Sequence, residues 1–249
     1  MIKGVGNKYI RLDKKDIFIC ASEALAVITV LNYLFYRSVY AYIVLSFPAF
    51  LYFCKRLEKE YRKKQHLAKE EFKEMLLLST TNQRAGYSVE NSLLESYEDL
   101  KRMYGEESFT VRLIKDISVA RKNNQPIYRI FINVGRNTNI KEIEDFGLIY
   151  KISYTKSGNV ANAMEKCAEQ IIERFEVENE IYNEMNERIF EMKIMNLMPL
   201  AIMLYIGMMN KGYFSVMYHN IKGILCMSLC LLIYVGAYFW GNKMTSIEV

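Results

Sequence analysis

The chain has 249 residues, 51% of them apolar, and its mean hydropathy is close to zero, so strongly apolar stretches must alternate with strongly charged ones. This profile is typical of a membrane protein with a sizeable soluble part. A net charge of only +5, without a basic stripe carrying interleaved aromatic residues, argues against a nucleic-acid partner. With three prolines and twelve glycines, helix is the favoured local state, and we expect an all-α fold.

Four windows are apolar enough to span a lipid membrane as helices, although the second and third fall short of the roughly 20 residues that cross the hydrocarbon core. They are residues 17–36, 39–54, 194–210 and 223–242. Only Arg37 and Ser38 separate the first two windows, so these helices must form a hairpin, and the last two form a second hairpin. The sequence therefore predicts a hairpin at 17–54, a helical domain at 55–193 and a hairpin at 194–242.

Basic residues gather before the first window and directly after the second, for example at Lys14, Lys15, Lys55 and Arg56. Short cytosolic flanks of membrane helices carry such an excess of Lys and Arg. We therefore expect residues 1–16, the domain at 55–193 and the tail at 243–249 to be cytosolic. This arrangement predicts a multi-pass membrane protein with both termini in the cytosol.

Two residues inside the apolar windows need a structural explanation. Glu23 is the only charge of the first window, and leaving it ionised against lipid costs about 3 kcal/mol, so we expect it to face a helix, water or a partner. A hydrogen bond within the helix bundle would satisfy it. Pro199 falls in the early turns of the third window, where proline is tolerated and kinks a helix.

The domain at 55–193 reads as a series of helices separated by turn residues. We expect them at 67–84, 89–104, 108–123, 127–134 and 140–156, with Ser88 and Ser108 as N-caps and a turn at 135–139. Gly86 and Gly158 follow two of these helices, where glycine suits the left-handed conformation that closes a helix. The residues after them share a weak pattern, which indicates either an internal repeat or two unrelated glycine turns.

The last helix of the domain, at 160–192, has two contrasting faces. Its apolar face includes Met164, Ile171, Phe175 and Tyr182. Glu178 interrupts that face, which indicates either that the helix leaves the domain core there or that it is kinked. At 100° per residue, eight glutamates fall within an arc of about 100° on the opposite side. This acidic ridge consists of Glu165, Glu169, Glu173, Glu176, Glu180, Glu184, Glu187 and Glu191. It is either a solvated helix face or a surface that docks to a basic partner.

No motif for chemistry is present in the sequence. The chain lacks a G-x-x-x-x-G-K-[ST] phosphate loop, and neither His66 nor His219 lies near a nucleophile or a paired carboxylate. The five cysteines have neither a disulfide framework nor zinc-ligand spacing. We therefore expect a protein that is not an enzyme and that holds no cofactor or metal.

The order of these features resembles the type II secretion system F domain family. The resemblance rests on a helix followed by Ala85-Gly86-Tyr87-Ser88-Val89, on Phe146 and Ser157-Gly158-Asn159-Val160, on Ile171-Ile172-Glu173-Arg174, and on Pro199 inside an apolar helix. The tail, with Gly212-Tyr213-Phe214, Gly223 and Ile247-Glu248-Val249, is similar to the TadB branch that serves Tad (Flp) pili. The resemblance covers residues 67–249.

This resemblance implies a platform protein around which a pilus or pseudopilus is assembled. Such proteins work beside a hexameric secretion ATPase, which is TadA-like in this branch, and beside a second F-type protein such as TadC. They act on pilin subunits, whose charged N-terminal region is an alternative partner for Glu23, and the acidic ridge would dock to the ATPase or to the second F-type protein. Having one F domain instead of two, this chain would form a heteromer or a homo-oligomer.

A different class of function remains compatible with the same elements. A membrane receptor or a transporter accessory subunit could also carry a cytosolic helical bundle that relays a signal. The short outer loops, Arg37-Ser38 and residues 211–222, argue against a sensor of external ligands.

Overall fold

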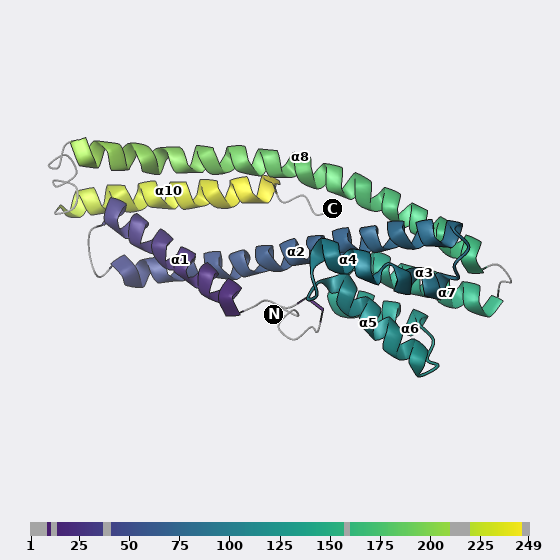
Figure 1. Cartoon of the computed structure of the whole chain (residues 1–249). Helices are drawn as coiled ribbons and strands as arrows, with labels where there is room; N and C mark the ends of the chain where they lie inside the picture. The colour runs from purple at the N-terminus through teal and green to yellow at the C-terminus, as the bar shows by residue number, and fades with distance from the viewer. Residues whose placement is uncertain (1–8, 11–13, 37–40, 157–159, 210–219, 246–249) are drawn as a thin grey trace. The chain divides into compact units, whose positions relative to one another are not determined.

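The computed structural model describes residues 9–10, 14–36, 41–156, 160–209 and 220–245, and within them it shows helices without any strand (Figure 1). The predicted all-α fold is confirmed. The helices are α1 (Lys14–Phe35), α2 (Ala41–Arg84), α3 (Val89–Glu95), α4 (Tyr97–Tyr104), α5 (Phe109–Lys122), α6 (Tyr128–Thr138), α7 (Lys141–Lys156), α8 (Val160–Met209) and α10 (Ile221–Thr245).

The chain divides into two compact units. The bundle unit comprises Met1–Lys14 and Glu58–Val177, and the apolar-helix unit comprises Lys15–Leu57 and Glu178–Val249. Helices α2 and α8 each contribute residues to both units. The sequence predicted separate helices starting at residues 67 and 194, but each of these segments continues an earlier helix without a break.

An aromatic cluster holds the core of the bundle unit together. The Phe72 ring of α2 lies 5.8 Å from that of Phe146 in α7, 6.3 Å from that of Phe131 in α6 and 6.5 Å from that of Phe175 in α8, all edge to face. Such pairs contribute about 0.5–1.5 kcal/mol each beyond the area that they bury. Since Phe72 is fully buried, one side chain of α2 joins three later helices.

Side-chain caps begin two of the helices as predicted. The Ser88 hydroxyl accepts a hydrogen bond from the Asn91 backbone N–H at the start of α3, and Ser108 does the same for Val111 at the start of α5. The Glu71 carboxylate also accepts hydrogen bonds from the backbone and hydroxyl of Thr110. Burial raises the pKa of Glu71, and these hydrogen bonds oppose the shift.

Two predicted boundaries inside the bundle unit are wrong. The helix expected at 89–104 is interrupted at Ser96, whose hydroxyl donates a hydrogen bond to the Leu93 carbonyl and so competes with the helix backbone. The turn expected at 135–139 is also displaced, because α6 runs on to Thr138 and the chain reverses at Asn139, which has a φ of 57°.

A close approach of α6 and α7 explains why Gly135 lies inside a helix. A Cβ atom at Gly135 would stand 2.4 Å from the backbone nitrogen of Glu144, and one at Gly147 would stand 2.8 Å from that of Ile132. Glycine is therefore required by the spacing of the two helices and not by a turn. Glycine inside a helix lowers stability relative to alanine, and the close packing of α6 on α7 offsets this free-energy cost.

Gly86 occupies the conformation predicted for it. It follows α2 with a φ of +100°, and a Cβ atom there would meet no neighbour within 4 Å, so the requirement for glycine is one of backbone conformation alone. Gly158, the second predicted turn, lies outside the described residues.

Three helices of the described chain, not four, are long and apolar enough to cross a membrane. They are α1 over Lys15–Phe35, α8, and α10 over Lys222–Gly241. The predicted span at 39–54 is not among them, because the apolar run of α2 is short and passes directly into the charged residues that begin at Lys55 and Arg56. Runs of 10–14 apolar residues do not by themselves indicate a spanning helix.

The position predicted for Pro199 is also wrong, because α8 starts at Val160 and Pro199 therefore lies deep inside it. A proline there removes the hydrogen bond to the carbonyl of Met195 and strains the neighbouring turn. The Tyr234 hydroxyl of α10 donates to the carbonyl of the next residue, Asn196, at 3.0 Å. A donor from the adjacent helix thus supports the disturbed turn.

Replacing Gly86 with Ala should destabilise the bundle unit by about 1–3 kcal/mol, because only glycine adopts its backbone conformation without strain. Tyr87→Ala, at the adjacent exposed position, should change stability by less than about 0.5 kcal/mol. The labelling rate of Cys167, a core thiol with 4% exposure, measures opening of the unit once the other four cysteines are replaced. Equal labelling of the two variants would contradict the assigned turn.

Candidate functional site

The apolar face of α8 is a core face only in the bundle unit. Met164, Cys167, Ile171 and Phe175 are buried, whereas Tyr182 is 38% exposed and the later positions are only partly covered. The buried stretch ends between Phe175 and Glu178, where the sequence predicted that the helix leaves the domain core. Burial raises the pKa of the Cys167 thiol to about 11, consistent with an inert core residue.

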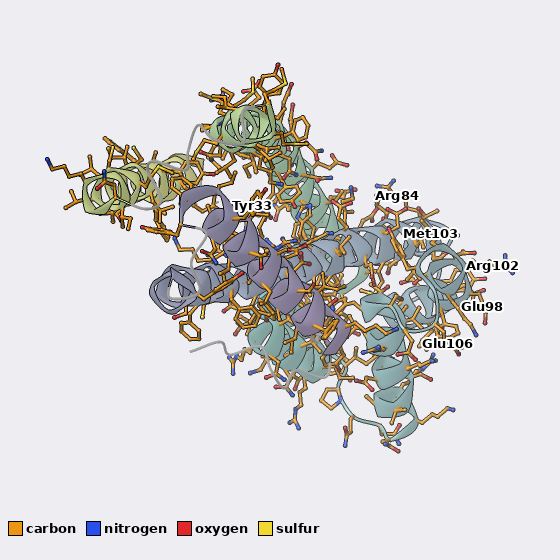
Figure 2. All side chains as sticks on the ribbon, turned by 90° about the vertical axis from the view of Figure 1, so that its left-hand side faces the viewer. Tyr33, Arg84, Glu98, Arg102, Met103 and Glu106 are labelled. Carbon is orange, nitrogen blue, oxygen red and sulfur yellow. The ribbon has the colours of Figure 1, made fainter. Side chains whose placement is uncertain are left out.

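The first two glutamates of the acidic ridge are held within the bundle unit. The Arg84 guanidinium, on the last residue of α2, donates from Nε to Glu165 at 2.7 Å and from Nη2 to Glu169 at 2.6 Å. Figure 2 shows the Arg84 side chain projecting at the surface of this unit. These contacts tie the end of α2 to the first turns of α8, so Glu165 and Glu169 already have a cationic partner.

The remaining residues of the acidic ridge differ from Glu165 and Glu169 in their ion pairing. Within the part of the chain that the structure describes, no ion pair involves them and all are exposed. They are Glu173, Glu176, Glu180, Glu184, Glu187 and Glu191. Glu173 and Glu176 lie in the bundle unit, and the other four lie in the apolar-helix unit.

Glu23 is paired with a residue of the next helix. Arg56 of α2 donates from Nε to Glu23 Oε2 at 2.7 Å and from Nη2 to Oε1 at 3.3 Å, a bidentate contact between the two helices of the first hairpin. Beside it, Lys55 Nζ lies 4.4 Å from the centroid of the Phe239 ring in α10. Glu23 therefore faces another helix, which is one of the arrangements that the sequence predicted.

An N-terminal contact was missed by the sequence reasoning, which treated residues 1–16 as a plain cytosolic tail. Tyr9 donates a hydrogen bond from its hydroxyl to Asp116 of α5, and its ring packs edge to face on Phe109 with centroids 5.9 Å apart. Ile10 is only 3% exposed and belongs to the core of the bundle unit. Burial and the Asp116 carboxylate raise the pKa of Tyr9.

We call Tyr9 and Ile10 the N-terminal strap. Only residues 11–13 separate it from Lys14, the first residue of α1. No periodicity marks so short a segment, so no sequence signal could have revealed the contact.

The described residues offer no arrangement suited to catalysis by a metal ion. No three His, Cys, Asp or Glu side chains gather among them closely enough to hold one. The polar groups that the structure does bring together form ion pairs, helix caps and other side-chain hydrogen bonds.

No protein-family model, curated protein or solved structure matches this chain. Functional conclusions must therefore come from its own geometry.

Ile10→Ala should release the N-terminal strap, because truncating a buried isoleucine typically costs 2–5 kcal/mol. Trypsin cleavage beside the strap should therefore accelerate at least about tenfold where opening precedes cutting. Tyr9→Phe, which loses one hydrogen bond, should have a smaller effect. Val119→Ala, at a 56% exposed position of α5, is the control. Equal cleavage of Ile10→Ala and the wild type would show that the strap is not seated.

Proposed function

We propose that this chain is the membrane platform protein of a pilus assembly machine of the Tad (Flp) or type II secretion kind. It is a scaffold that couples a cytosolic secretion ATPase to the extrusion of pilin subunits. The motif order around Gly86, Ile171 and Pro199 supports this family. The observation that carries the function is the continuity of α8 from the bundle core to an apolar segment.

This continuity matters because a platform must transmit force. A helix of the length of α8, 50 residues, spans about 75 Å at 1.5 Å per residue, and it runs from Met164 in the bundle core to Met209 with one backbone hydrogen bond left unmade at Pro199. A push or a rotation applied to the bundle unit would reach the apolar segment through one covalent and hydrogen-bonded rod. Helix α2 offers a second connection of the same kind.

Exposed apolar side chains support a membrane location for the apolar-helix unit. Leu225, Leu232 and Ile233 of α10 are 65–71% exposed, which would be unfavourable in water. Tyr33 near the end of α1 and Trp240 near the end of α10 are also exposed, and aromatic residues of this type favour membrane interfaces. We propose the cytoplasmic membrane, with the apolar run of α2 as a short fourth crossing and both termini in the cytosol.

The exposed part of the acidic ridge is the proposed docking surface. Glu165 and Glu169 are excluded from it because both are already ion-paired with Arg84. The ridge carboxylates Glu173, Glu176, Glu180, Glu184 and Glu187 would steer a basic surface of the ATPase or of a second F-type protein towards α8. A homo-oligomer would use the same helix through other faces, since like charges repel.

Single cysteines in a cysteine-free chain test the orientation. A probe applied outside intact cells should label a cysteine at Asn220 and should not label one at Lys101, because four crossings return the chain to the cytosol before and after the bundle unit. If α2 did not cross, the bundle unit would lie outside and Lys101 would be labelled. That result would refute the proposed topology.

Asn186→Pro should abolish pili while leaving the protein in the membrane. Asn186 is exposed on α8, and proline inside a helix costs about 3 kcal/mol or more and breaks the rod. Asn186→Ala preserves the helix and should support normal assembly. Surface pilin and membrane-inserted protein would be quantified for both variants. Normal piliation with Asn186→Pro would show that force does not pass through α8.

A further inference from the structure

Lysines of two helices gather around the end of α10 within the apolar-helix unit. Lys55 Nζ of α2 lies 4.4 Å from the centroid of the Phe239 ring. A Cβ atom at Gly241 would stand 3.0 Å from the sulfur of Met192 in α8, and α8 and α10 run side by side (Figure 1). The end of α10 therefore lies beside Lys55 of α2 and beside the turn of α8 that carries Lys193.

Trp240 lies between these two contacts on α10. Successive residues of a helix point about 100° apart, so the indole projects from α10 between the directions of Phe239 and Gly241. It is 72% exposed, and the side chains of Lys55 and Lys193 are exposed as well. An exposed aromatic ring and two exposed cations thus occupy the same end of this unit.

No carboxylate satisfies these two lysines within the described residues. Glu23 of α1 is held in a bidentate ion pair by Arg56, the neighbour of Lys55. Glu191 lies two residues before Lys193, and therefore about 200° around α8, so it projects from another side of that helix. The contact of Lys55 with the Phe239 ring positions its ammonium group without neutralising it.

The surroundings of the two lysines indicate which anion they meet. Leu232 and Ile233, about two turns before Trp240 on α10, are 71% and 65% exposed, so this surface faces hydrocarbon in the proposed membrane location. Tryptophan favours the level of the headgroups, and lysines beside a membrane attract anionic lipids. The phosphates of lipid headgroups are therefore the anions nearest to this end of the unit.

We propose that Lys55, Trp240 and Lys193 form a surface that selects anionic phospholipids, with the ammonium groups contacting headgroup phosphates. We call this surface the headgroup collar. The inference rests on the membrane location proposed above, but it requires neither the ATPase nor a pilin. Both α2 and α8 continue into the bundle unit, so lipids bound at the collar would anchor the two helices that are proposed to transmit force.

Trp240 is the single tryptophan of the chain, so its fluorescence reports lipid contact at the collar in the full-length protein. The protein would be reconstituted in phosphatidylcholine vesicles that contain increasing fractions of one brominated lipid. That lipid is either phosphatidylglycerol or phosphatidylcholine, with the same acyl chains brominated near the glycerol. Bromine quenches tryptophan on contact, so the two quenching curves give the relative affinity of the collar for the anionic lipid.

We expect the wild type to prefer phosphatidylglycerol by about fivefold or more, the effect of one lysine close to a membrane surface. Salt at about 1 M should reduce the preference, because it screens charges beyond about 3 Å. Lys55→Gln with Lys193→Gln should remove most of it. Lys193→Gln alone should remove part of it and leaves the contact between Lys55 and Phe239 intact.

Lys122→Gln with Arg129→Gln is the matched control. It removes the same charge from two exposed positions of the bundle unit and should leave the lipid preference unchanged. An equal loss in this control would assign the preference to the net charge of the protein and overturn the collar.

The remaining outcomes separate the inference from the proposed function. Equal quenching of the wild type by the two brominated lipids, or an undiminished preference in Lys193→Gln, overturns the headgroup collar and leaves the membrane location intact. Absence of quenching by both lipids overturns the membrane location, and the inference with it. Should the double lysine variant fail to insert, the wild type, the single variant and the control still decide.

Discussion

The structure depends on one physical constraint, the helical backbone of α8, which satisfies its own polar groups along 50 residues except for the hydrogen bond that Pro199 cannot donate. A helix satisfies its own N–H and C=O groups, so it can pass from a packed bundle into an apolar environment without an unpaired backbone group. The same helix therefore supplies Met164 and Phe175 to the bundle core and, after Lys193, a largely exposed apolar surface of which Leu200 and Met203 are partly buried against other apolar side chains. Because a break would expose polar backbone, the transition is made by a change of side chains alone.

Each of the two units has one ion-pair cluster that joins α2 to another helix. Arg84 ties the last turn of α2 to Glu165 and Glu169 of α8 in the bundle unit, and Arg56 ties α2 to Glu23 of α1 in the apolar-helix unit. The first cluster is exposed and contributes position more than stability, since surface pairs are weak. The second lies where charge is costly, and there a bidentate contact keeps Glu23 from an unpaired state.

Features encoded in a few neighbouring residues were predictable from the sequence. The caps Ser88 and Ser108 and the closing Gly86 act on the backbone within three or four residues, so their chemistry is visible in a short window. Gly135 was misread because its role is set by Glu144, which belongs to another helix. A glycine demanded by close packing looks the same in sequence as one demanded by a turn.

In the candidate site, too, features set by local sequence were predictable, and contacts between distant segments were not. Helical periodicity placed the acidic ridge opposite the apolar face, but the ion pairs of Glu165 and Glu169 depend on Arg84, which lies 81 and 85 positions away. The partner of Glu23 and the N-terminal strap are also contacts between distant segments. The predicted number of membrane-spanning helices was wrong for a related reason. Helix α2 joins a short apolar run to a charged run, and neither run by itself indicates that the two form one helix.

Polar contacts also explain how the apolar helices associate at all. In lipid the hydrophobic effect does not drive helices together, so van der Waals packing and hydrogen bonds must do so. The Tyr36 and Ser228 hydroxyls, 2.8 Å apart, join α1 to α10, and Tyr234 joins α10 to the turn of α8 that Pro199 disturbs. Asn196 lies in the turn of α8 that precedes Pro199, so α10 attaches to α8 where that helix is disturbed. Helix α10 is the element to which α1, α2 and α8 each attach.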